Sequence, residues 1–106
     1  MWKMSVLLRK DLPRHYQAVQ GGHAVAEILL QELESQKDGI SQRKGWNNGT
    51  LVYLVVPDEP ALLKWAAQLA GLGVFHAIWK EPDLSYQTTA LAAVTDQPIF
   101  EDLSLF

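Results

Sequence analysis

The chain has 106 residues, of which 48% are hydrophobic, and a formal net charge of -3 at pH 7. This length and apolar content predict one domain, residues 1–106, with enough side chains to bury a core. The absence of cysteine excludes a disulfide framework, a thiolate zinc site and a cysteine nucleophile.

The N-terminal segment and the charge distribution narrow the possible environments. Residues 1–13 contain only a short apolar run, well below a signal h-region or the roughly 20 residues of a membrane span. We therefore expect a cytoplasmic protein with no membrane partner. Residues 1–50 hold seven basic and five acidic side chains, whereas residues 51–106 hold two and seven. The asymmetry allows a local basic patch, but the acidic total argues against a general nucleic-acid binder.

The first half of the chain predicts a strand followed by a long helix. Residues 5–9 form a short apolar run typical of a buried strand, which "KDLP" ends. A helix is expected over residues 16–36, because apolar residues recur there at three- and four-residue steps. The inward face of this helix is expected to contain Ala18, Gly22, Val25, Leu29 and Leu33. Residues 37–50 have no period and predict a loop, with Trp46 anchored on the core.

A second strand and helix follow. Residues 50–56 are β-branched and apolar without alternation, which favours an interior strand. Asp58 is a good N-cap, and Pro60 suits the first helical turn. The glycines at 71–73 end the predicted helix.

Two further strands complete the predicted fold. They span residues 74–79 and 88–94, and residues 95–106 are expected to be irregular or to form a short helical turn. Alternating strands and helices favour a mainly parallel sheet, while the eight-residue connection requires the last strand to run antiparallel to its predecessor. The expected fold is therefore an α/β three-layer α/β/α sandwich with a four-stranded mixed sheet whose last strand is antiparallel.

The segment "VQGGHAVAEILL" places two glycines inside the first helix. Each costs about 1 kcal/mol relative to alanine, so something must approach the backbone closely there. One interpretation is tight packing on the sheet, with His23 as a partly buried histidine. The other is a site at the carboxyl end of the first strand, where open α/β sheets bind ligands.

Two polar groups could form that site. The first comprises Lys10, Asp11, Arg14, His15, Gln20 and His23. The second, around residues 80–89, includes Glu81, Asp83 and Thr89, and could instead be a solvated turn. In the functional interpretation, carboxylates of the second group orient a water molecule or a histidine of the first. The three histidines are too scattered to predict a metal site.

Three segments resemble type II peptidyl-tRNA hydrolases over about residues 5–94. "VLLRKDL" followed by "AVQGGHA" is similar to the family's strand ending in Arg-x-Asp-Leu and its helix carrying Ala-Ala-Gln-x-x-His-Ala. "LVYLVVPDEPALLKWAAQLAGLG" resembles the second strand and helix, and "TTALAAV" resembles the last strand. The resemblance implies the family's three-layer fold, often a homodimer, and cofactor-free hydrolysis of the ester that joins peptide to tRNA.

Aligned through Gln20 and His23, the chain departs from the family at two places. Tyr16 stands where the family has a lysine of its catalytic set, and the segment after Leu12 is about two residues shorter. The family's Asp-Ala-Gly-x-Thr-Gln segment is replaced by "EPDLSYQ", in which Glu81 is the nearest acid. The resemblance thus carries over Asp11, Gln20, His23 and Thr89.

Two classes of function remain open at this stage. In an esterase, His23, Asp11, Glu81 and Thr89 would be catalytic, and the substrate, peptidyl-tRNA or a smaller acyl ester, would be bound by Lys10, Arg14, His15, Gln20 and Asp83. The alternative is a non-catalytic protein: either a module that binds an acidic or nucleotide-like ligand or a protein partner, or a structural homodimer whose exposed face includes Trp2, Trp79 or the C-terminal "LSLF". No cofactor and no metal are expected in either case.

Overall fold

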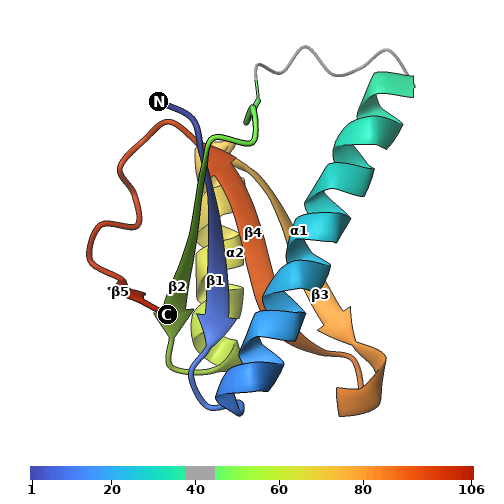
Figure 1. The fold of residues 1–106 in the computed structure, drawn as a ribbon, viewed down its shortest axis with the longest axis vertical. Helices are drawn as coiled ribbons and strands as arrows, with labels where there is room; N and C mark the ends of the chain where they lie inside the picture. The colour runs from blue at the N-terminus through green and yellow to red at the C-terminus, as the bar shows by residue number, and fades with distance from the viewer. Residues whose placement is uncertain (38–44) are drawn as a thin grey trace.

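The computed structural model describes residues 1–37 and 45–106, which form an α/β fold with two α-helices and one five-stranded mixed sheet. The elements in chain order are β1 (Lys3–Arg9), α1 (Arg14–Lys37), β2 (Thr50–Val56), α2 (Glu59–Leu72), β3 (Phe75–Glu81), a 3-10 turn η1 (Pro82–Leu84), β4 (Gln87–Thr95) and β5 (Ser104–Leu105). Figure 1 shows their arrangement.

The strand order in the sheet is β3-β4-β1-β2-β5. β1 and β2 are parallel, whereas β4 runs antiparallel to both β1 and β3, as the short connection before it requires. The prediction of a four-stranded sheet is wrong, because a fifth strand, β5, pairs antiparallel with β2. A two-residue strand has no alternation period that the sequence could display. Its position is secured by the following residue, Phe106, whose backbone N–H donates to Tyr53 O at 2.9 Å and whose ring meets the Tyr53 ring edge-on.

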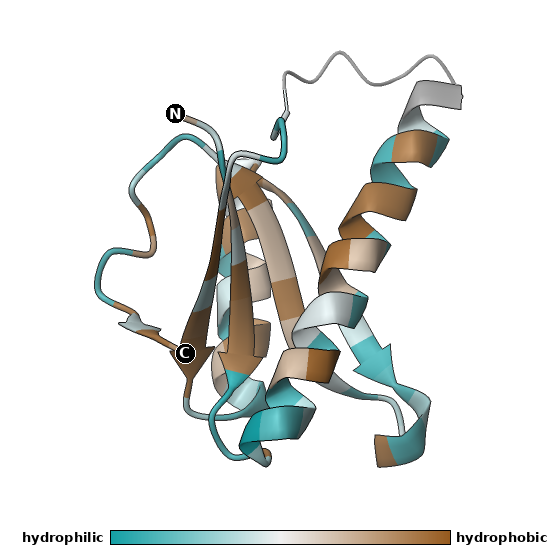
Figure 2. Ribbon diagram, viewed as in Figure 1, coloured by the Kyte–Doolittle hydropathy of each residue, from teal (hydrophilic) through white to brown (hydrophobic). Residues whose placement is uncertain are grey.

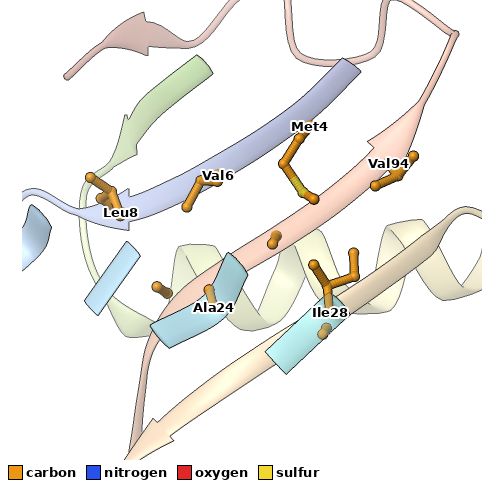
Figure 3. Packing of buried hydrophobic residues seen from close by; sticks show 9 residues of the cluster. Met4, Val6, Leu8, Ala24, Ile28 and Val94 are labelled. Atoms are coloured by element: carbon orange, nitrogen blue, oxygen red, sulfur yellow. The ribbon is translucent and has the colours of Figure 1, made fainter. Parts of the chain in front are cut away.

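The two helices pack on opposite faces of the sheet (Figure 1). Successive side chains of β1 point to opposite sides. Met4, Val6 and Leu8 join a buried cluster with Ala24 and Ile28 of α1, which Figure 3 shows from close by. Leu7, which lies between Val6 and Leu8, contributes to a second cluster on the α2 side.

The inward face of α1 differs from the expected one. The buried residues are Gln17, Gln20, Gly21, Ala24 and Ile28. By contrast, Gly22 is exposed, and the side chains of Leu29 and Leu33 are 44% and 54% exposed. The periodicity is ambiguous because α1 has apolar residues on two faces, and Figure 2 shows apolar bands along the helix well beyond its first turns.

Only the first glycine of the pair meets a close approach. A Cβ on Gly21 would lie 2.9 Å from Leu8 Cδ2 and 2.9 Å from Tyr53 Cζ, so this position brings α1 against β1 and β2. A Cβ on Gly22 would meet nothing within 4 Å. Tight packing on the sheet therefore accounts for Gly21 but not for Gly22.

Other local predictions are confirmed. The Asp58 carboxylate accepts a hydrogen bond from the Ala61 N–H at 3.1 Å, and Gly73 ends α2 with φ 68°. Trp46 packs against the α1-side core and donates from Nε1 to Thr50 O. The predicted loop 37–50 includes residues 38–44, which lie outside the described residues. Among the described helices, neither has the length and apolar content needed to cross a membrane.

Substituting the two glycines separately should change stability in opposite directions. Gly21→Ala should lower the free energy of unfolding by about 1 to 2 kcal/mol, because the cost of overpacking exceeds the gain in helix propensity. Gly22→Ala should raise it by about 1 kcal/mol. Urea unfolding of both variants measures the difference, and a Gly21→Ala protein as stable as the parent would contradict the close approach.

Candidate functional site

The site lies at the end of the sheet where α1 begins. β1, β2 and β3 all run toward this edge, and β4 starts there (Figure 1). The first turns of α1 and the segment that joins β3 to β4 consequently meet at one rim. This is the proximity expected for the two polar groups of the sequence.

Three buried side chains connect these segments. Gln20 of α1 donates from Nε2 to Glu81 Oε1 at 2.9 Å and accepts at Oε1 from the Thr89 hydroxyl at 2.6 Å. Gln20 is 1% exposed, Thr89 0% and Glu81 8%, so the network is sheltered from water. Because a buried amide must find both a donor and an acceptor, this cluster fixes α1 relative to the ends of β3 and β4.

A β-bulge places Thr89 in this network. Trp79 pairs with Ala90 and Lys80 pairs with Thr88, so Thr89 has no register partner on β3. Strict alternation would turn Thr89 away from α1, because Ala90 belongs to the α1-side core. The extra residue redirects the hydroxyl toward Gln20, which is a common use of bulges beside functional sites.

Glu81 is held as a carboxylate. The Gln20 amide and then the Asp83 backbone N–H, which donates to Oε2 at 3.1 Å, lower the pKa of Glu81 below its usual value. The nearby His23 acts in the same direction. This carboxylate is therefore ionised at neutral pH and can stabilise a positive charge beside it.

Two side chains of α1 border this carboxylate. The exposed His23 imidazole stacks on the Trp79 ring, with centroids 4.7 Å apart and planes at 15°. Partial burial and then the charges of Glu81 and Asp83 raise the pKa of Tyr16 above its usual value, so its hydroxyl remains a proton donor. Tyr16, Gln20 and His23 are four and three residues apart, which aligns them along one side of the helix.

Asp11 belongs to a separate network. Its two carboxylate oxygens accept from Arg9 Nε at 3.0 Å and Arg9 Nη2 at 2.9 Å. Arg9 also donates from Nη1 to Gln87 Oε1 and Thr88 O. The Thr88 N–H donates to Glu59, at the start of α2. Asp11 is expected from the sequence to be catalytic, but in the structure its carboxylate is bound by Arg9.

Arg9 was not among the predicted site residues. It is 7% exposed at the end of a mainly buried strand, and a buried guanidinium requires several acceptors. The sequence feature that could have identified Arg9 is its charge at the end of the run "SVLLR", with Asp11 two residues away.

The predicted substrate-binding residues are divided between locations. Gln20 is in the buried network, while Asp83 contributes its backbone N–H to Glu81. The Arg14 guanidinium lies over the Phe106 ring, 4.2 Å from its centroid. Lys10 borders a different hollow, beside Ser104 and Val56. His15 is exposed.

Lys10 and Arg14 therefore contact other groups than the Gln20–Glu81–Thr89 network. Across residues 1–37 and 45–106, no group of three or more His, Asp or Glu side chains is arranged to hold a metal ion.

Comparisons with known proteins bear on the fold. A solved structure of a protein of unknown function from Agrobacterium tumefaciens, Atu0240, is similar to this chain with a TM-score of 0.60 and 16% identity. The match covers 99% of this chain and 97% of that one. No protein-family model and no curated protein matches the sequence. At this identity the likeness concerns the α/β architecture only.

The Gln20–Thr89 hydrogen bond should give a measurable coupling. Thr89→Val leaves the Gln20 carbonyl without its buried donor and should cost about 1 to 3 kcal/mol of stability. In a double-mutant cycle with Gln20→Met, the coupling energy should be about 1 kcal/mol. Chemical denaturation of the four proteins tests this, and additive losses would show that the two side chains act independently.

The Arg9–Asp11 ion pair predicts a pH-dependent contribution to stability. Arg9 holds the pKa of Asp11 below its usual value, so the carboxylate stabilises the fold above about pH 4. This contribution disappears as the pH falls through the lower folded-state pKa.

Asp11→Asn should therefore cost about 1 kcal/mol at pH 7, a modest value because the Asp11 side chain is 43% exposed. The difference from the parent should shrink under acid conditions. Asp96→Asn, at an exposed carboxylate, is the control. Urea midpoints at pH 7 and pH 3 measure the effect. A stability difference between parent and Asp11→Asn that grows in acid would contradict a stabilising Arg9–Asp11 pair.

Proposed function

We propose that this chain is a divergent ester hydrolase of the type II peptidyl-tRNA hydrolase kind, with that family's three-layer arrangement. The substrate class is peptidyl-tRNA or a related acyl ester. The supporting observation is the Glu81 carboxylate, held by Gln20 and bordered by the exposed His23 and by Tyr16. At this rim His23 offers a base, Tyr16 a neutral hydrogen-bond donor, and Glu81 a fixed negative charge.

In the proposed reaction, His23 removes a proton from a water molecule, which attacks the ester carbonyl carbon. The Tyr16 hydroxyl donates a hydrogen bond to the developing oxyanion. When the tetrahedral intermediate collapses, the ribose oxygen leaves and takes the proton from the His23 imidazolium. The products are a peptide acid and a tRNA with a free terminal hydroxyl.

Each remaining residue supports one of these steps. Glu81 stabilises the transient imidazolium, and Trp79 limits the orientation of the His23 ring by stacking on it. Gln20 and Thr89 position the carboxylate without contacting substrate. Tyr16 replaces the cation of the family with a neutral donor, which favours a slower enzyme because oxyanion stabilisation is weaker.

The proposal predicts a specific pattern of activity loss. With peptidyl-tRNA as substrate, His23→Ala should lower kcat/KM by roughly 10² to 10⁴, and Tyr16→Phe by roughly 10². His76→Ala is the matched control, because that histidine lies near the opposite end of β3, with Nδ1 against Val74 O. Release of free tRNA is the measurement, and circular dichroism confirms that each variant is folded.

Two outcomes would contradict catalysis at this site. If His23→Ala were as active as the parent, His23 would not be the catalytic base. Complete inactivity of the parent, combined with thermal stabilisation by intact tRNA, would favour the non-catalytic binding module; a ligand at 100 times its Kd adds about 2.7 kcal/mol.

A further inference from the structure

A cavity lies on the α2-side face of the sheet, away from the candidate site. α2 packs mainly on β1, β3 and β4, while residues 96–103, between β4 and β5, run past β2 (Figure 1). A hollow of about 300 Å³, which we call the β1–β2 cavity, lies between this segment, Lys3 and Ser5 of β1, and Val52 and Leu54 of β2. Because a protein cavity of about 150 Å³ holds benzene, this one has room for a ligand of about ten non-hydrogen atoms.

The segment that covers the β1–β2 cavity is fixed by packing and by short turns. The Phe100 ring packs on the Trp65 ring of α2, with centroids 4.9 Å apart, and Phe100 is 7% exposed. The Gln97 N–H donates to Thr95 Oγ1 at 3.1 Å. The Leu103 N–H donates to Phe100 O at 3.1 Å. The cavity is therefore preformed, which lowers the entropic cost of binding a ligand.

The floor of the β1–β2 cavity contains a buried polar group without a partner. Ser5 is 4% exposed, and its side chain points away from the side of β1 that Met4 and Val6 bury against α1. Among residues 1–37 and 45–106, no group forms a hydrogen bond with the Ser5 hydroxyl, and Ser5 lines the cavity. A buried hydroxyl without a hydrogen bond lowers stability, so this one indicates a ligand that supplies the missing partner.

Charge and polarity change along the β1–β2 cavity. Lys3 is level with Thr50, Ser5 is level with Val52, and Leu54 is four residues beyond Thr50. At a rise of about 3.3 Å per residue, the level of Leu54 is about 13 Å from that of Lys3. Leu54 is buried, whereas Lys3 is exposed and forms no ion pair with another described residue. The cavity therefore has a cationic end, a hydroxyl midway and an apolar end.

We infer that the β1–β2 cavity binds a small carboxylate with an apolar tail, the chemistry of a medium-chain fatty acid. The carboxylate pairs with the Lys3 ammonium and accepts a hydrogen bond from the Ser5 hydroxyl. The tail lies against Leu54 and Leu103, away from water.

The number of charges at the cavity selects a single negative charge on the ligand. Among the described residues that line it, Lys3 is the one Lys, Arg or His. Glu101 of the covering segment also borders the cavity, and its charge disfavours a phosphate or a second carboxylate.

This inference stands independently of the proposed hydrolase activity. The Gln20–Glu81 hydrogen bond and the stacked His23 lie on the α1 side of the sheet. Loss of binding in the β1–β2 cavity would therefore leave ester hydrolysis unchanged, and the two proposals can fail separately.

Titration with octanoate, followed by amide NMR, tests whether the cavity binds this chemistry. The parent should bind octanoate with a Kd below about 1 mM, with shifts at Val52, Leu54 and Leu103 and none at Tyr16 or His23. Octylamine, which has the same tail and a positive head, should bind at least about tenfold more weakly. The absence of saturable shifts around the cavity, or tighter binding of octylamine, would overturn the inference.

Substitutions of charged residues test the position of the carboxylate. Lys3→Gln should weaken octanoate binding about fivefold to tenfold, because it removes the ion pair. Glu101→Gln should strengthen it about twofold, because it removes a like charge. Lys80→Gln, at an exposed lysine of β3 on the opposite edge of the sheet, is the matched control and should bind as the parent does. Unchanged affinity of Lys3→Gln, weaker binding by Glu101→Gln, or an equal loss in Lys80→Gln would overturn the inference.

Ser5→Ala separates a ligand contact from a structural role. It should weaken octanoate binding about threefold or more, because the carboxylate loses a hydrogen bond. Without ligand, its thermal midpoint should equal or exceed that of the parent, since the hydroxyl has no partner in the described part of the chain. A lower midpoint without ligand, or octanoate affinity equal to that of the parent, would overturn the inference.

Discussion

The buried carboxamide of Gln20 determines how α1 is rotated on the sheet. It must satisfy a donor and an acceptor in a place that water does not reach, and Glu81 and Thr89 provide them. Gly21, the next residue, allows the helix to come close enough for these bonds to form, because a side chain there would collide with Leu8 and Tyr53. One polar constraint and one steric constraint thus position the same helical turn.

This rotation has consequences on both sides of the helix. On one side, Tyr16 and His23 are brought to the rim beside Glu81. On the far side, Val19, Leu30 and Leu33 are left exposed to solvent. In α1, the polar Gln20 therefore occupies a core position while leucines occupy the surface. A helix of an isolated globular domain normally shows the reverse pattern.

The sequence predicted those features that depend on local chemistry. The strands β1 to β4, the Asp58 cap and the glycine end of α2 follow from residue preferences that act over a few positions. The proximity of the α1 and β3–β4 segments follows from strand direction. The inward face of α1 did not follow, because two apolar stripes share the helical period. Neither β5 nor the bulge at Thr89 has a periodic signature, since each depends on backbone pairing between distant segments.

The polar residues that the sequence places in one cluster lie apart in the structure, because they bind different partners. Arg9 is buried and needs an acidic partner, so the Asp11 carboxylate is paired with Arg9. Arg14 lies on the opposite flank of α1 from Tyr16, over the C-terminal Phe106 ring. The rim around Glu81 therefore has an ionised acid and an exposed imidazole, with neither Lys10 nor Arg14 beside them. In the proposed reaction, proton transfer by His23 and the neutral hydrogen-bond donor Tyr16 therefore supply the catalysis, because neither Lys10 nor Arg14 is placed to stabilise the oxyanion.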